Sequence, residues 1–122
     1  MTIDFQRDKP IYQQLLDRLS SEIVRGDRKP GDKLPSVRDY AIETGVNPNT
    51  MSRTYKELEV MGIAETRRGQ GTFVTEDEER LEQLRNEMKT KHTESFVSQM
   101  KDLGFSIDEM IEELKENKEG DS

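Results

Sequence analysis

The sequence predicts a mostly α-helical chain with one small β-hairpin. Apolar residues recur every three or four positions in several segments, as they do on the buried face of a helix. Most of these segments begin at proline, serine or asparagine and end at glycine, the residues that start and stop helices. One glycine-rich tip separates two short runs of β-forming residues. Three helices, with a short turn between the second and third, and then a hairpin make a winged helix-turn-helix pattern, which two more helices follow.

The first predicted helix lies in the segment PIYQQLLDRLSSEIVRG, which begins at Pro10. Its apolar stripe runs from Ile11 to Ile23, with Tyr12 beside it. Proline in the first turn and Gly26 after the last one are the expected boundaries. A loop dense in turn residues follows, DRKPGDKLP.

The second predicted helix is SVRDYAIET, with Ser36 as its cap and Gly45 as its end. Asp39 stands three residues after the cap, as in a capping box. The apolar side chains expected to be buried are Val37, Tyr40 and Ala41. Arg38 then points outward, where a guanidinium can bind a backbone phosphate.

The third predicted helix begins with Asn47 as its cap and Pro48 in its first position, and Gly62 closes it. Its apolar stripe consists of Met51, Tyr55, Leu58 and Met61. The outward residues are therefore Asn49, Ser52, Arg53 and Lys56, with Thr50 in the first turn. Such a helix can read DNA, since asparagine pairs with adenine, arginine with guanine, and hydroxyls with bases or phosphates. Taken one by one, these side chains could equally be a cap and a solvated surface.

The hairpin is predicted from two β-type runs, Ile63–Arg67 and Thr72–Thr75. Arg67 and Arg68 stand beside a Gly-Gln-Gly tip, residues 69–71, that carries no bulky side chain beyond Gln70. Such a tip can approach a duplex closely and place arginine on phosphate or in the minor groove. The alternative is a tight turn that needs glycine for its backbone, with two solvated arginines.

The tail, residues 76–122, is predicted to form two helices, at about 77–103 and 107–117, after a winged domain of residues 1–75. Gly104 separates the two helices, and Ser106 with Glu109 forms a second capping box. The apolar positions predicted to form a dimer interface are Leu81, Leu84, Met88, Phe96, Met100, Leu103, Ile107, Met110, Ile111 and Leu114. Pairing of two copies would also explain an apolar fraction of only 30%.

The charge is distributed unevenly along the chain. Residues 1–74 hold 12 Lys and Arg against 11 Asp and Glu, while residues 75–122 hold 7 against 15. The net charge of −7 therefore belongs to the tail, and the first part can present a basic face to nucleic acid.

Several other classes of function are excluded or unsupported. Without cysteine there are no disulfides or thiolate metal sites. No apolar run is long enough for a signal peptide or a membrane span, so a cytoplasmic protein is expected. The single histidine, His92, lies in a polar stretch, and no catalytic set, metal site or phosphate-binding loop is found. We expect no enzyme activity and no cofactor.

The segment KLPSVRDYAIETGVNPNTMSRTYKELEVMGIAETRRGQGTFV resembles the DNA-binding signature of the GntR family of bacterial transcription regulators. The likeness extends back through helix one and covers about residues 9–75. The motif VNPNT and the short acidic tail resemble those of the YtrA subgroup, whose members dimerise through two C-terminal helices.

The resemblance implies a homodimer that binds a palindromic operator, usually as a repressor, often of a transporter operon and of its own gene. By motif position, the residues implied to contact DNA are Ser36, Arg38, Asn47, Asn49, Thr50, Ser52, Arg53, Arg68, Gly69, Gln70 and Gly71, to which the hairpin adds Arg67. Many relatives carry arginine where Ser52 stands, so Arg53 could read a base or reach a phosphate. Only 47 residues follow the wing, and any effector site would have to lie at the dimer interface.

Other functions stay open on the residues alone. A winged-helix module could bind a protein, with the acidic tail docking on a basic partner, and would then bind DNA negligibly at about 50 mM salt. The chain could also activate transcription or respond to a metabolite.

Overall fold

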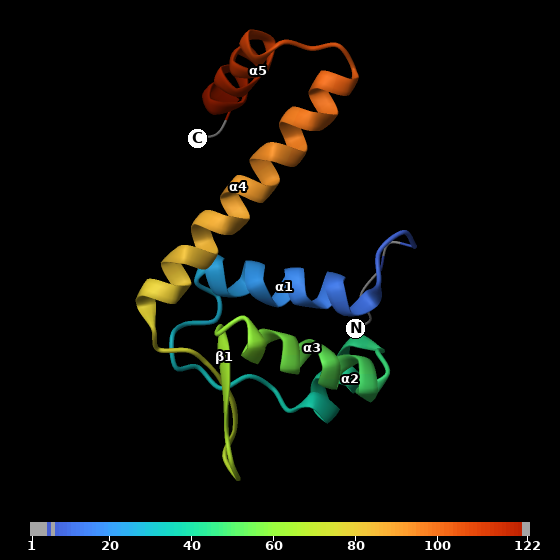
Figure 1. Cartoon of the computed structure of the whole chain (residues 1–122), viewed down its shortest axis with the longest axis vertical. Coiled ribbons are helices and arrows are strands. Elements are labelled where there is room, and N and C mark those ends of the chain that lie inside the picture. The colour runs from blue at the N-terminus through green and yellow to red at the C-terminus, as the bar shows by residue number, and fades with distance from the viewer. Residues whose placement is uncertain (1–4, 6, 121–122) are drawn as a thin grey trace. The chain divides into compact units, whose positions relative to one another are not determined.

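The computed structural model describes residue 5 and residues 7–120 and contains five helices and a two-stranded antiparallel sheet in these ranges (Figure 1). The helices are α1 (Ile11–Arg25), α2 (Val37–Thr44), α3 (Pro48–Val60), α4 (Glu78–Asp102) and α5 (Ile107–Gly120). The strands are β1 (Ala64–Arg67) and β2 (Gly71–Val74). The predicted fold class is confirmed, and every predicted boundary of these elements lies within three residues of the observed one. The chain divides into two compact units, residues 1–84 and 85–122, which are described separately.

The core of the first unit is built around α3, which packs on α1, α2 and β1. Its large, fully buried apolar side chains are Leu15, Leu19, Leu34, Met51, Leu58, Ile63 and Val74. Each contributes on the order of 1.5–3 kcal/mol relative to its exposed state. The stripes predicted from helical spacing therefore form this core, except that Ile11 is 43% exposed and that Val37 and Met61 are only half-buried.

The ends of the three helices follow the predicted capping chemistry. The backbone N–H of Asp39 donates to Ser36 Oγ (3.0 Å), and that of Asn49 donates to Asn47 Oδ1 (2.8 Å). Gly26 and Gly45 take the left-handed conformation, with φ of 92° and 73°, and so close α1 and α2. Between α2 and α3 only three residues remain, which gives the short turn of a helix-turn-helix.

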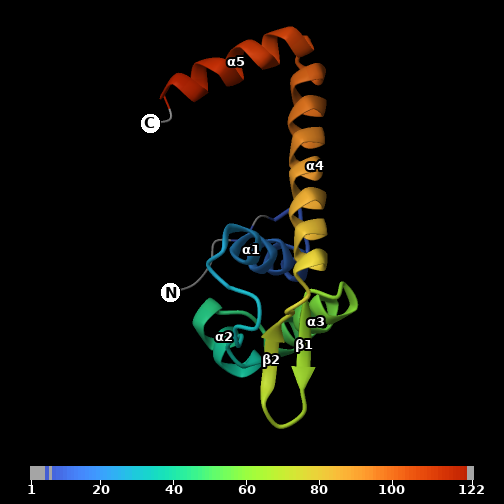
Figure 2. The ribbon, with the colours of Figure 1, turned by 90° about the vertical axis from the view of Figure 1, so that its left-hand side faces the viewer.

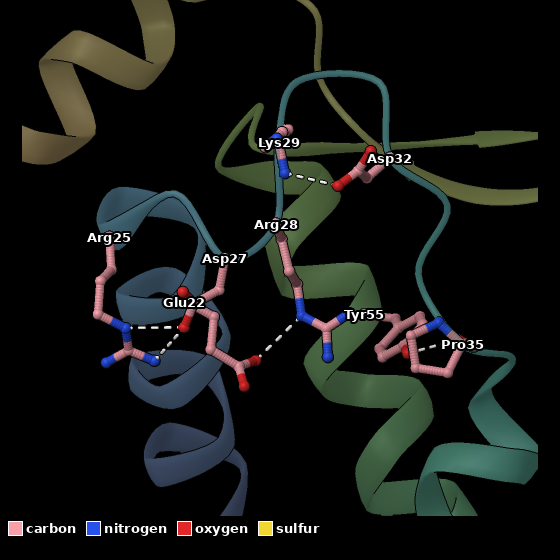
Figure 3. Close-up of polar contacts among 8 residues, drawn as sticks. All are labelled: Glu22, Arg25, Asp27, Arg28, Lys29, Asp32, Pro35 and Tyr55. Carbon is pink, nitrogen blue, oxygen red and sulfur yellow. Dashed lines mark hydrogen bonds and ion pairs between the residues drawn. The ribbon is translucent and has the colours of Figure 1, made fainter.

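The loop before α2 is fastened to α1 and α3 (Figure 3). Arg28 Nε donates to Glu22 Oε1 on α1 (3.0 Å), and Tyr55 Oη on α3 donates to the carbonyl of Pro35 (2.6 Å). The backbone N–H of Lys29 donates to the side-chain carboxylate oxygen Oδ2 of Asp32 (2.7 Å). These bonds place the residue that precedes the α2 cap, and so help to set the start of α2.

The hairpin gains a third strand-like segment that the sequence did not predict. Residues 31–34 lie along β2. The backbone N–H of Leu34 donates to the carbonyl of Thr72 (2.8 Å), and the backbone N–H of Val74 donates to the carbonyl of Asp32 (2.8 Å). Lys33 lies opposite Phe73 in this antiparallel pairing. Both views show the hairpin projecting beyond the three helices of its unit (Figures 1 and 2).

The second unit contains α4 from residue 85 onward and the whole of α5. The reciprocal capping box at the start of α5 is formed, since the N–H groups of Glu109 and Ser106 donate to each other's side chain (3.2 and 3.0 Å). Met110 is buried at 2% exposure, whereas Ile107, Ile111 and Leu114 remain 45–55% exposed. An amphipathic helix thus keeps much of its apolar face uncovered within the chain.

Candidate nucleic-acid interface

The N-terminal turns of α3 present most of the predicted base-reading residues. Asn47 caps the helix through its side chain, so its carbonyl oxygen Oδ1 is already occupied by the N–H of Asn49. Asn49 itself is exposed, while Thr50 and Ser52 are half-buried. Asn49 is therefore the amide in this helix whose side chain is best placed to reach a base edge.

Arg53 is exposed but engaged with another helix. Its guanidinium carbon lies 3.8 Å from the centre of the Tyr12 ring, which stands in the first turn of α1. A cation over an aromatic face at this distance is attracted by the ring quadrupole. Sequence spacing had placed Tyr12 only beside the core stripe of α1.

The start of α2 supplies Ser36 and Arg38, both exposed. Ser36 is committed to its cap, because Oγ accepts from the Asp39 N–H at 3.0 Å. Arg38 forms no hydrogen bond or ion pair with the residues that the structure describes, and its charge is available to a phosphate.

The two wing arginines differ in their surroundings. Arg67 donates to Glu65 Oε1 (3.0 Å), and its guanidinium carbon lies 4.3 Å from the centre of the Phe73 ring. Arg68 is exposed at the turn and has no such partner in the described part of the chain. Of the two arginines predicted to contact DNA from the tip, Arg67 therefore already has partners within the chain, whereas Arg68 has none among the described residues.

The tip glycines both require positive φ, 78° at Gly69 and 121° at Gly71. The turn is closed by the N–H of Gln70, which donates to the carbonyl of Arg67 (2.8 Å). Gln70 is exposed, so its side-chain amide is presented at the end of the hairpin.

Lys33 is a cation of the wing that the sequence did not suggest. Its stem crosses Gly71, where a Cβ would stand 2.8 Å from Lys33 Cε and 3.6 Å from Nζ. Since Lys33 lies opposite Phe73, the two side chains share one face of the ladder. No local pattern signals this placement, because residues 31–34 and β2 are about forty residues apart.

The protonation states of Arg28 and Tyr55 suit the bonds that fasten the loop before α2. Burial lowers the pKa of Arg28, but the hydrogen bond and charge of Glu22, with Tyr40 nearby, outweigh burial and leave that pKa raised. Burial also raises the pKa of Tyr55 well above its ordinary value. Tyr55 therefore remains a neutral donor to Pro35.

Other kinds of site have little support. In the described ranges, no three His, Cys, Asp or Glu residues gather as metal ligands, and no helix there has the length and apolarity to cross a membrane.

Of the predicted dimer residues, Leu84 and Met110 are already buried by their own chain. Leu81, Met88, Phe96 and Met100 are half-buried, and Leu103 is 73% exposed.

Comparison with known proteins agrees with this geometry. A family described as "Bacterial regulatory proteins, gntR family" matches residues 11–74. The uncharacterized HTH-type transcriptional regulator YhcF of Bacillus subtilis is 51% identical over 120 residues, 98% of this chain and 99% of YhcF. The HTH-type transcriptional repressor YtrA of the same bacterium is 49% identical over 75 residues, 62% of this chain and 58% of YtrA.

Solved structures give the same result. A GntR family transcriptional regulator from Listeria monocytogenes has a TM-score of 0.86 and 44% identity, with 92% of this chain and 98% of that chain covered. The DNA-binding domain of AraR in complex with operator ORX1 has a TM-score of 0.54 and 26% identity, with 62% of this chain and 92% of that chain covered.

The fold and these likenesses define a winged helix-turn-helix transcription regulator rather than an enzyme. The chain belongs to the GntR family, and the match to YtrA supports the predicted YtrA-like subgroup.

Proposed function

We propose that the chain is a homodimeric repressor that binds a two-fold symmetric DNA operator. The observation that carries the DNA part is the hairpin that projects from the same unit as α3, with uncommitted cations on α2 and at the hairpin turn. Relatives support this proposal. The structure of the AraR DNA-binding domain was solved in complex with an operator, which supports an operator as the ligand, and YtrA is described as a repressor.

In this proposal α3 enters the major groove and the wing lies along the neighbouring backbone. Asn49 reads a base edge, and Ser36, Asn47, Thr50 and Ser52 bind nearby polar groups. Arg38, Arg67 and Arg68 bind phosphates, and residues 69–71 let the tip approach the duplex. We add Lys33 to this set, because its ammonium group shares the wing face with Phe73.

Selection of duplexes from a random pool tests the DNA part. The purified chain should recover a two-fold symmetric consensus at moderate salt, with half-sites one DNA turn apart, about 34 Å, or a multiple of that spacing. Asn49→Ala should lose about 1–3 kcal/mol of discrimination at one base position, whereas Arg38→Ala should weaken all sequences alike. No recovery even at low salt would reject the regulator and favour a protein-docking module.

The dimer part rests on the uncovered apolar side of α5. Its exposed members are Ile107, Ile111 and Leu114, with Leu103 and Phe105 before them. A chain this small and this polar gains stability by burying such a face against a second copy. An effector, where one binds, would lie at that interface.

Sedimentation at micromolar concentration tests the dimer. The unmodified chain should sediment as a dimer, and Ile111→Lys should sediment as a monomer because it places a charge in the apolar face. Glu116→Lys is the matched control, since it puts the same side chain about 140° further round the helix. A monomeric unmodified chain, or dissociation by both variants alike, would reject the interface.

Transcription from the recovered operator, measured with and without the protein, tests repression. A decrease when the protein is added supports a repressor, and an increase would identify an activator.

A further inference from the structure

Arg53 is held against α1 by the ring of Tyr12. The distance from its guanidinium carbon to the ring centre, 3.8 Å, is that of two stacked planar groups. The two residues belong to helices that pack directly on each other. Arg53 is thus bound to a fixed element of the same unit before any ligand arrives.

The stack leaves the hydrogen-bonding capacity of Arg53 intact. A cation–π contact uses the flat face of the guanidinium, while its five N–H donors lie in the plane of the group and point away from its edges. None of the ion pairs formed among the described residues uses Arg53. The side chain is therefore both oriented and able to donate to an anion.

The stack also fixes the side of α3 on which Arg53 lies. Successive helical residues are turned by about 100°, so Arg53 is about 40° from Asn49 around the axis. Since Tyr12 stands on α1, the guanidinium leans to the α1 side and away from the centre of the outward face. A bidentate contact to guanine would require it to leave the ring and extend into the groove.

We infer that Tyr12 is a positioning residue that holds Arg53 at the α1 flank of the recognition helix, where Arg53 binds a backbone phosphate rather than a base. This inference rests on the proposed DNA-binding function. A duplex groove is bordered by phosphates on both sides, so an arginine at the flank of an inserted helix meets the backbone. Pre-orientation by the ring lowers the ordering cost of that contact.

Binding measurements on the selected operator test the inference. Arg53→Ala should weaken binding to the operator and to each of its single-base variants by the same factor. It should also reduce the slope of log affinity against log salt by about 0.9, the value of one phosphate. A loss confined to one base pair would overturn the phosphate assignment.

Two substitutions of Tyr12 test the positioning role. Tyr12→Phe keeps the ring and should bind like the unmodified chain. Tyr12→Leu removes the ring and should weaken binding about two- to five-fold, the range of an exposed cation–π contact. In the Arg53→Ala background Tyr12→Leu should have no further effect, because the group that it positions is gone.

An equal effect of Tyr12→Leu in both backgrounds would show a merely structural role and overturn the positioning assignment. If Tyr12→Leu does not fold, as urea denaturation would show, Arg53→Lys replaces it. Lysine keeps the charge but lacks the planar fork, so it should bind more weakly than arginine on every sequence and keep the salt slope. Unchanged affinity would overturn the role of the stack. Failure of the unmodified chain to select any operator would instead reject the proposed function.

Discussion

The wing offers a sharp test of how the backbone and Lys33 depend on one glycine. Gly71 has φ of 121°, a conformation almost restricted to glycine, and Gly69 has φ of 78°, in the left-handed region. A Cβ at Gly71 would stand 2.8 Å from Lys33 Cε, whereas one at Gly69 would meet nothing within 4 Å. Gly69→Ala is therefore a matched control for Gly71→Ala.

The expected magnitudes follow from these differences. Alanine in the left-handed region costs about 1–2 kcal/mol, and in the glycine-only region about 1–3 kcal/mol. In both variants alanine also reduces the entropy of the unfolded chain, which returns about 0.4–1 kcal/mol. The lysine stem is flexible and can swing away from the new methyl group. We therefore expect Gly71→Ala to be less stable than Gly69→Ala by on the order of 1 kcal/mol, or about 4–8 °C in Tm for a domain of this size.

Urea denaturation gives the stability difference, and salt-dependent DNA binding gives the effect on Lys33. Gly71→Ala should lower the salt slope as much as Lys33→Ala does, with no further decrease in the double variant, because both remove the same phosphate contact. Lys29→Ala is the control for loss of a lysine from the same loop. If Gly71→Ala proves as stable as Gly69→Ala, or if Lys33→Ala leaves the slope unchanged, the role of this glycine is refuted.

Three further predictions concern the bonds that fasten the loop before α2 and the cap of α5. Tyr55→Phe should lose about 0.5–1.5 kcal/mol in urea denaturation, because it leaves the Pro35 carbonyl without its donor; unchanged stability would show that water replaces the hydroxyl. Arg28→Ala, which breaks a largely buried ion pair, should destabilise the chain more in thermal melts than Arg25→Ala, whose pair is more than half exposed and worth about 0–1 kcal/mol. The reverse order would contradict the burial argument. Ser106→Ala should lower the helical circular dichroism and hydrogen-exchange protection of α5, at a cost of about 1 kcal/mol, and equal protection in both chains would argue against the cap.

The helices and their ends were predictable because their signals are local. Ser36, Asn47 and Ser106 accept backbone N–H groups two or three residues away, so the bond that starts each helix is encoded within one turn. The buried stripe of α3 follows from its spacing alone. The hairpin was predictable for the same reason, since its tip glycines need positive φ whatever else surrounds them.

Side-chain partners distant in sequence were not predictable. Arg53 and Tyr12, or Lys33 and Gly71, are separated by about forty residues, and no periodicity links them. The burial of Leu84 and Met110 likewise depends on packing that spacing does not reveal, although both lie on a predicted apolar stripe. The sequence placed Arg53, Leu84 and Met110 on the correct faces but could not tell which neighbour each one meets.

The sequence by itself determined the order of helices and strands, the winged helix-turn-helix class and the outward residues of α3, because caps, glycines and apolar spacing act over a few residues. Only the tertiary structure decided that residues 31–34 extend the hairpin, that Lys33 crosses Gly71 and that Arg53 stacks on Tyr12. These contacts exist because packing α3 between α1, α2 and β1 brings together segments whose meeting has no local cause.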